Sequence, residues 1–179
     1  MSANTISRNG ERNSASAKQR FQLTPQEEAE IRYWLENINE MECWIAFEKK
    51  YKSIMKRMSI GYTNLHRDDV IDEVLVAVIT DVNGYLLKKN NFLSFLNVKI
   101  KRVGFQMICD KYGVDPNDYV IYTKVNECCT KYDISCTERN AYKIAGLTGL
   151  SISKALIGVS VHKVVTAVSF EDYFAQKNV

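Results

Sequence analysis

The chain has 179 residues, of which 46% are hydrophobic, and it carries a formal net charge of +3. This length and composition allow one or two small hydrophobic cores and exclude an assembly of several large domains. The weak positive charge permits nucleic-acid binding without requiring it, because proteins that coat DNA are usually far more basic.

Residues 1–22 are expected to form a disordered tail. The segment is rich in Ser, Asn, Arg and Lys and has almost no large apolar side chains, so burial cannot offset the entropy lost on ordering. It lacks the apolar block of a signal peptide, and we identify no later run of about 18 apolar residues as a membrane span. We therefore predict a cytoplasmic protein without a membrane partner.

Two amphipathic helices are predicted between residues 24 and 58. Thr24, Pro25 and Glu27 are typical of a helix start, with an N-cap, a first-position proline and an acid in the first turn. The apolar faces comprise Ile31, Trp34, Leu35 and Ile38 in the first helix, and Met41, Trp44, Ile45, Tyr51, Ile54, Met55 and Met58 in the second. Both faces follow helical spacing. A polar loop is expected at residues 61–67.

A third helix is expected to begin at Asp68 or Asp69, because acids suit the positive end of the helix dipole. Its buried face would comprise Ile71, Val74, Leu75, Val78, Val82 and Tyr85. The competing interpretation is a strand, since Val and Ile are frequent from residue 70 to residue 82. We favour a helix because no turn residue interrupts the segment before Asn83 and Gly84.

A fourth helix is predicted from Phe92 to Lys111, after a turn at residues 88–91. Its core stripe comprises Phe92, Leu96, Ile100, Val103 and Met107, and a second stripe beside it comprises Phe95, Lys99, Arg102 and Gln106, with Lys101 and Phe105 further toward solvent. The second stripe suits DNA, because cations meet phosphates, an amide and a guanidinium reach base edges, and an aromatic ring stacks on an unpaired base. The alternative is a solvated face on which Phe95 completes the core.

Residues 113–117 are rich in turn formers and predict a break between two helical subdomains, residues 23–113 and 114–179. Shorter helices are expected at residues 119–131, 138–147 and 152–158, with Thr137 and Ser151 as N-caps of the last two. Residues 164–179 fit either an extended segment or a short helix. The sequence as a whole therefore predicts an all-α protein.

No catalytic or metal-binding pattern is found. The five cysteines form no C-x-x-C pair, and the two histidines stand far apart from any ligand cluster. Phosphate-binding loops, nucleophile elbows and zinc-protease motifs are also absent from the sequence. We therefore expect a non-enzymatic protein without a metal or cofactor.

Residues 68–111 resemble region 2 of the sigma-70 family of bacterial transcription initiation factors. Residues 69–73, DVIDE, are similar to the D-L-x-Q-E sequence that opens the helix by which those factors grip the polymerase clamp. Residues 92–95, FLSF, are similar to F-x-T-Y, which opens the promoter-melting helix that recognises the −10 element. The hydrophobic pattern of residues 100–110 fits the rest of that helix.

The second half also resembles this family. Residues 143–151, KIAGLTGLS, are similar to the E-I-A-E-x-L-G-x-S pattern of sigma region 3, and residues 168–172, VSFED, to the S-L-D stretch that follows it. The resemblance covers residues 44–172, and the order and spacing of the motifs carry it. It implies a helical region 2-like bundle followed by a small three-helix region 3-like subdomain.

The resemblance also implies partners and contact residues. Core RNA polymerase would be bound through its clamp by Asp69, Asp72 and Glu73, for which the alternative is ordinary acids at a helix N-terminus. Promoter DNA would be bound at the −10 element by Phe95, Lys99, Lys101, Arg102, Phe105 and Gln106. The protein would thus direct promoter recognition and transcription initiation.

The sequence departs from the family pattern at three points. Asp72 replaces the usual Gln of the clamp-binding motif, and Val98 and Lys99 stand where primary sigma factors have a Trp pair, which puts strand separation in doubt. No region 4 follows, which leaves open a fragment, a split factor with a separate region 4 subunit, or a diverged mobile-element relative. An anti-sigma factor would be a further partner.

Two other functions remain open on the sequence. Residues 140–158 fit a free-standing helix-turn-helix regulator, with Ala145, Gly149 and Ala155 where that motif needs a small residue, a turn glycine and an apolar residue. Only Lys143 and Lys154 supply positive charge there, which argues against strong groove binding. The third hypothesis is a sigma-fold protein-interaction module that binds no DNA.

Overall fold

The computed structural model describes residues 21–58, 65–88 and 91–177, with side chains described as far as residue 169. Within these ranges the elements are α1 (Pro25–Glu36), α2 (Met41–Arg57), α3 (Arg67–Thr80), α4 (Val82–Leu86), α5 (Phe92–Tyr112), α6 (Pro116–Tyr132), the 3-10 helix η1 (Glu138–Asn140), α7 (Ala141–Thr148) and α8 (Ile152–Lys177). No described residue lies in a strand, so the all-α prediction is confirmed, and the strand alternative for α3 is wrong. Residues 1–20 of the predicted tail and most of the loop predicted at residues 61–67 lie outside the described residues.

Helix α1 begins as its sequence predicts. The Thr24 hydroxyl accepts a hydrogen bond from the Glu27 amide, and the Glu27 carboxylate accepts one from the Thr24 amide in return. This reciprocal capping box satisfies amides that the first helical turn would leave without a partner. Phe21, which the sequence analysis assigned to the tail, is partly buried against the core, with the Arg57 guanidinium 3.9 Å from the centre of its ring.

The third predicted helix is interrupted one turn earlier than expected. Helix α3 ends at Thr80, Asp81 breaks the helical run, and the short helix α4 contains Asn83 and Gly84, which were predicted to mark its end. A Cβ atom on Gly84 would lie 2.3 Å from Oδ1 of Asp81. Gly84 therefore leaves room for the Asp81 carboxylate. At this break the Asp81 side chain reaches Lys99 of α5.

The helices before Gly113 enclose a core of large aromatic and aliphatic side chains. Phe47, Tyr51, Tyr85 and Phe92 are buried, and the Phe92 ring meets the Phe47 and Tyr85 rings edge to face at centroid distances of 6.0 and 5.7 Å. Such edge contacts add to the free energy of burial. The Tyr51 hydroxyl donates a 2.6 Å hydrogen bond to the carbonyl of Ile71, which joins α2 to α3.

The helices after Gly113 are packed around smaller side chains. Their core comprises Val125, Cys129, Ile134, Ala141, Ile144, Ala145, Ala155 and Val159. Helix α8 crosses α6 at Gly158, where an added Cβ atom would lie 2.6 Å from a methyl group of Val125. The close approach of two helices therefore requires glycine at this position.

Helix α8 is much longer than the sequence analysis predicted. It continues from Ile152 to Lys177, so the short helix at residues 152–158 and the separate tail segment at residues 164–179 are one element. Gly158 did not end the helix because it packs against α6 in the helix interior. Of the two predicted N-caps, Ser151 is confirmed, since its hydroxyl accepts a hydrogen bond from the Lys154 amide at 3.3 Å. Thr137 precedes η1 and forms no side-chain capping hydrogen bond.

One segment of α8 is long and apolar enough to cross a membrane, judged by length and composition alone, and we identified no such segment in the sequence. It spans Ile152–Ser169, and 28% of it is buried within the protein. The core helix of a soluble protein meets the same criteria, and Ala155, Val159 and Val165 of this segment are buried against the protein. Cytoplasmic localisation therefore stays a prediction.

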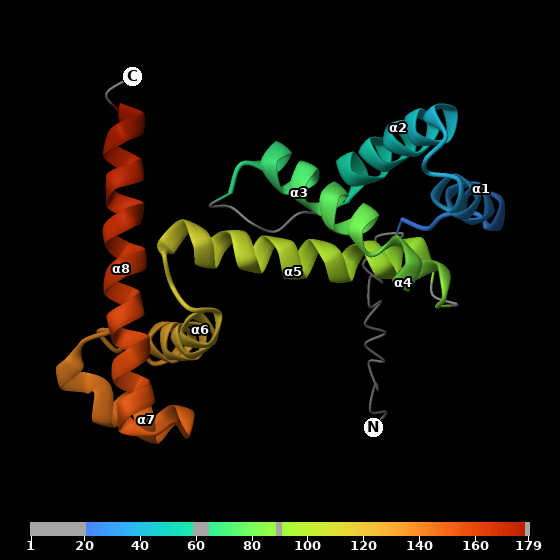
Figure 1. Ribbon diagram of the computed structural model, residues 1–179. Coiled ribbons are helices and arrows are strands. Elements are labelled where there is room, and N and C mark those ends of the chain that lie inside the picture. The colour runs from blue at the N-terminus through green and yellow to red at the C-terminus, as the bar shows by residue number, and fades with distance from the viewer. Residues whose placement is uncertain (1–20, 59–64, 89–90, 178–179) are drawn as a thin grey trace, which may run out of the picture.

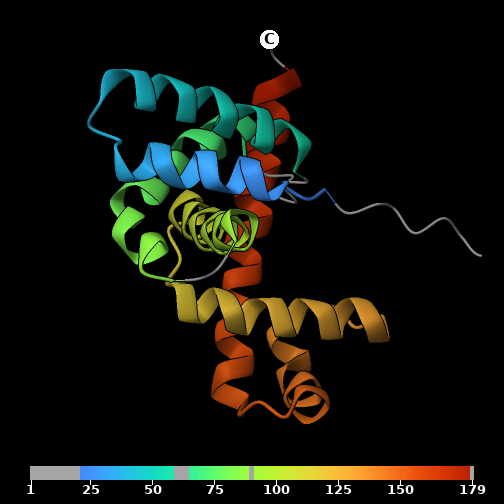
Figure 2. The ribbon, with the colours of Figure 1, turned by 90° about the vertical axis from the view of Figure 1, so that its right-hand side faces the viewer.

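The two groups of helices meet at an aromatic junction. In Figure 1, α5 runs across the view and α8 stands nearly perpendicular to its end, and Figure 2 shows α6 crossing α8 below α1–α5 and above α7. Gly113 ends α5 with a φ of 62°, and the Asp115 carboxylate caps α6 by accepting from the Asn117 amide. Tyr112 and Tyr122 are buried there beside Val161 of α8. The predicted break is therefore a packed corner of the chain.

Candidate functional site on helices α3 and α5

Helix α5 carries every residue predicted to contact DNA, and its first turn is held from two sides. The Asn91 side chain accepts a hydrogen bond from the Ser94 amide, and the Glu28 carboxylate of α1 accepts one from the Phe92 amide at 2.9 Å. Two of the amides at this helix N-terminus are therefore satisfied, and the carboxylate also suits the helix dipole. Helix α5 is in this way aligned with α1 as well as with α3.

Lys99 does not face solvent, which contradicts its predicted role as a phosphate contact. Its side chain is buried, and its Nζ atom lies 2.6 Å from the Asp81 carboxylate and 5.2 Å from the centre of the Phe95 ring. The hydrogen bond from Lys99, reinforced by its charge, lowers the pKa of Asp81 below its ordinary value. Lys99 therefore joins α5 to the α3–α4 break, since its position beside the core stripe brings it next to Asp81.

The two aromatic rings predicted to stack on bases also have other partners. Phe95 is partly buried against the core, with its ring 5.0 Å from that of Tyr85. Phe105 is partly buried, and its ring meets Tyr119 of α6 edge to face at 5.8 Å. For Phe95 the alternative from the sequence analysis, completion of the core, therefore holds. Phe105 packs at the junction with α6, which that analysis did not predict.

Three of the six predicted DNA contacts are exposed on α5. Lys101, Arg102 and Gln106 are all accessible to solvent, and the Gln106 amide nitrogen donates a 2.8 Å hydrogen bond to the Asp110 carboxylate. Val98 lies one turn before Lys101 and Arg102 and is 63% exposed, although it is apolar. The exposed face of α5 therefore combines two cations, an amide and an aliphatic side chain.

The three residues predicted to contact polymerase are exposed on α3. Asp69 lies in the first turn, with its carboxylate 3.8 Å from Nδ1 of His66, and Asp72 and Glu73 lie in the next turn. Asp69 therefore also fits the alternative of an ordinary acid at a helix N-terminus. Glu73 differs from the other two because it lies at the border with α5.

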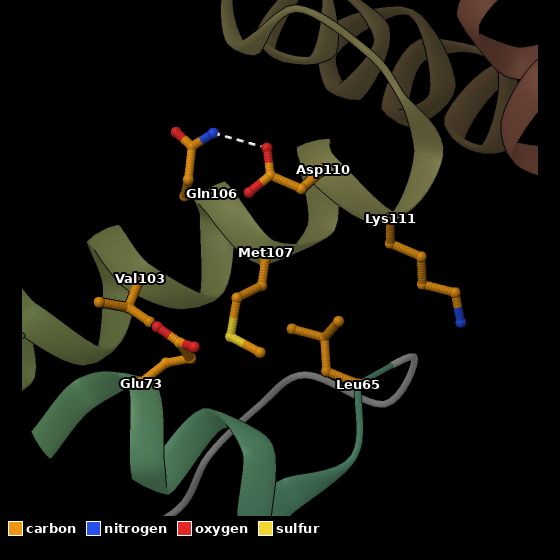
Figure 3. A pocket seen from close by; sticks show the side chains of 7 residues that line it. All are labelled: Leu65, Glu73, Val103, Gln106, Met107, Asp110 and Lys111. Carbon is orange, nitrogen blue, oxygen red and sulfur yellow. Dashed lines mark hydrogen bonds between the residues drawn. The ribbon is translucent and has the colours of Figure 1, made fainter. Parts of the chain in front are cut away.

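A groove separates α3 from α5 and brings the two predicted surfaces together at Glu73. Its two hollows, of about 470 and 590 Å³, share the residues Glu73, Val103 and Gln106. Figure 3 shows that Met107 points toward Leu65 in the smaller hollow, whereas Gln106 turns away toward Asp110. The two helices are antiparallel, so that the beginning of α3 lies beside the end of α5.

The thiols of Cys109, Cys129 and Cys136 are poorly suited to nucleophilic chemistry. Burial raises the pKa values of Cys109 and Cys129, and it raises that of Cys136 to about 12. A thiol attacks as its thiolate, so a raised pKa makes it less reactive. Among the residues that the structure describes, no three His, Cys, Asp or Glu side chains are grouped as a metal site.

Asp81, the partner that holds the Lys99 ammonium away from solvent, was not predicted from the sequence. Asp81 is 18 residues from Lys99 along the chain, and no helical repeat connects the two. The pair of residues Asn83 and Gly84 suggested a turn nearby, which was the one local signal of a break. Comparisons with protein-family models, with curated proteins and with solved structures find no match to this chain.

Proposed function

We propose that the protein is a sigma-like subunit that joins core RNA polymerase to promoter DNA. In this proposal α1–α5 form the region 2-like bundle and α6–α8 the region 3-like subdomain. Helix α3 contacts the polymerase clamp and α5 contacts the −10 element. The proposal rests on the order and spacing of the sequence motifs, because the comparisons add no relative.

One structural observation supports this assignment more than any other. Exposed acids of α3 and exposed cations of α5 lie on two helices that pack directly against each other. An acidic helix face suits a basic protein surface, whereas a basic helix face suits a phosphate backbone. The arrangement therefore allows one rigid pair of helices to bind both partners at once.

The structure changes which residues we assign to DNA. We retain the three exposed residues Lys101, Arg102 and Gln106. We exclude Lys99, Phe95 and Phe105, which pack within the fold. Lys101 is the candidate phosphate contact, and Arg102 and Gln106 are candidates for base edges because each can donate to acceptors in the major groove.

In vitro transcription with core polymerase tests the proposal directly. The assay measures open-complex formation on promoters with single −10 substitutions, with and without a separate polypeptide that supplies region 4. Arg102→Ala or Gln106→Ala should relax preference at particular positions, each by about 1–3 kcal/mol. Lys101→Ala should weaken all promoters alike and reduce the salt slope by about one. Wild-type behaviour of all three variants on every promoter would contradict DNA binding by α5.

Lys99→Ala is the matched control on the same helix. It should lower the melting temperature, because it removes the ion pair with Asp81, but leave the salt slope of DNA binding unchanged. Reduction of the slope by this variant would restore Lys99 as a phosphate contact.

Polymerase binding has a separate test. Asp72→Arg combined with Glu73→Arg should weaken co-purification with core polymerase and leave helicity intact, since reversed charges oppose a basic clamp surface. Unchanged co-purification would remove α3 from the interface and favour the protein-interaction module without polymerase.

A helix-turn-helix regulator is the second candidate, and the backbone of α7 and α8 favours it. Gly149 occupies the turn with a φ of 70°, and Ala145 and Ala155 are buried between the helices. The exposed start of α8 carries Ile152 and a single cation, Lys154, which suits phosphates poorly. Tight, sequence-specific duplex binding without polymerase at physiological salt would favour this candidate.

A further inference from the structure

A small groove lies between α6 and α7, outside the α3–α5 site. It has a volume of about 300 Å³, and its lining includes Lys124, Glu127, Lys131 and Tyr132 from α6 and Leu147 from α7. Tyr132 and Leu147 are 47% and 44% exposed, so apolar surface from both helices is accessible at the groove. The groove therefore combines exposed apolar surface with alternating charges.

The charges of this groove follow a regular order along one face of α6. Lys124 and Lys131 are seven residues apart, which corresponds to two helical turns or about 10.5 Å. Glu127 lies between them on the same face. The face is thus positive, negative and positive in order. Residues seven apart on a second helix have the same spacing as the two lysines.

The lysines of this groove form few interactions within the protein itself. Neither Lys124 nor Lys131 forms an ion pair with an acid among the described residues, and the closest described partner of the Lys131 ammonium is the Tyr132 ring, 4.9 Å from its centroid. By contrast Lys163 of α8 is paired with Glu138 at 2.6 Å. The lysines of the groove are therefore available to a partner.

We propose that this groove binds an amphipathic helix of a protein partner whose facing residues are acidic, basic and acidic. Acids at positions i and i+7 face Lys124 and Lys131, and a cation between them faces Glu127. An apolar side chain of the partner fills the groove against Leu147 and Tyr132. This is helix-in-groove recognition, in which apolar anchors supply affinity and charges set the register.

Glu127 distinguishes this partner from a nucleic acid. A phosphate backbone carries negative charge at every nucleotide, so it cannot meet both lysines without also approaching the Glu127 carboxylate. A helix can place a cation at that point. The inference concerns a surface away from α3 and α5, and it stands or falls separately from the proposed DNA binding.

Fluorescence anisotropy with the full chain tests the proposal. The probe is a fluorescein-labelled helical peptide of about 20 residues, long enough to be helical in water, with two Glu seven apart, a Lys between them and Leu on the same face. Wild-type protein should bind it, and Lys124→Glu with Lys131→Glu should weaken binding roughly tenfold or more. Lys49→Glu with Lys56→Glu is the matched control, since these exposed lysines are also seven apart on α2.

A charge-reversed peptide separates recognition from a folding defect. This peptide has Lys in place of both Glu and Glu in place of the central Lys, and it should bind the Lys124→Glu, Lys131→Glu protein better than the wild type. A variant that had merely lost its fold would bind neither peptide. Leu147→Asp should weaken binding of the original peptide while circular dichroism reports unchanged helicity.

Three outcomes would overturn the proposal. The first is absence of peptide binding by the wild type, and the second is equal loss of binding in the α2 control. The third is that a single-stranded oligonucleotide binds the wild type, loses its binding in the lysine variant and is not displaced by the peptide. That result would assign the groove to nucleic acid.

Discussion

The helices before Gly113 and those after it build their cores from different kinds of side chain. The first group interlocks large rings, with Phe47, Tyr51, Tyr85 and Phe92 fully enclosed. The second brings backbones together over Ala145, Ala155 and Gly158. Removal of atoms should therefore damage the first group most, whereas addition of atoms should damage the second.

The largest expected effect is a cavity in the first core. Phe92→Ala removes a ring that contacts Phe47 and Tyr85, so it should lower the free energy of unfolding by about 3–5 kcal/mol. Chemical denaturation measures this change. Val98→Ala, at an exposed position on the same helix, should change it by less than about 0.5 kcal/mol. Equal effects at the two positions would mean that α5 is not packed as described.

A single added methyl group should disturb the second core. Gly158→Ala places a Cβ atom 2.6 Å from a methyl carbon of Val125, which is itself fully buried, so we expect a loss of about 1–3 kcal/mol. Val125→Ala in the same chain should recover part of this loss, because the two sites are in contact. Thermal and denaturant unfolding would both report it. A neutral single variant would break the comparison between the two groups.

A glycine on an exposed helix face should respond in the opposite direction. Nothing lies within 4 Å of a Cβ atom built on Gly146, which is in the interior of α7. Gly146→Ala should therefore stabilise the protein by about 0.5–1 kcal/mol through helix propensity. If Gly146→Ala and Gly158→Ala both destabilise the protein, close packing at Gly158 does not explain the effect of its substitution.

The smallest effect concerns pH and the first helix. The hydrogen bond from Lys50 is the main cause that lowers the pKa of Glu27 from 4.5 to about 2. A lowered pKa means that this carboxylate stabilises the fold above pH 4.5 and that its contribution is lost as the pH falls toward 2. Lys50→Ala should flatten the pH dependence of the melting temperature in this window. Lys49→Ala should leave the dependence as in the wild type.

The helices themselves were largely predictable from local patterns. Thr24, Pro25 and Glu27 identified the start of α1, and Ser151 the start of α8, because capping involves residues within one turn. Apolar spacing correctly identified Phe92, Leu96 and Ile100 as buried residues of α5, but it missed Gly104, Cys109 and Tyr112. The length of α8 was missed, because a glycine in a helix interior is indistinguishable in sequence from one that ends it.

The site was less predictable, and the reason is geometric. Helical spacing correctly placed Arg102 and Gln106 outside the core, but it could not separate them from Lys99 and Phe95 on the same stripe. A stripe at the border of a core is buried or exposed according to the neighbour that covers it. That neighbour is the α3–α4 break for Lys99 and Phe95, and α6 for Phe105.

The sequence by itself therefore determined that the described chain is helical, where most helices begin and which stripe of each is apolar, since these depend on residues a turn apart. Only the tertiary structure decided that Asp81 takes Lys99 out of solvent, that α6 covers Phe105, and that Lys124, Glu127 and Leu147 border one groove. These contacts join residues many turns apart, and their energies depend on which surfaces the whole fold brings together.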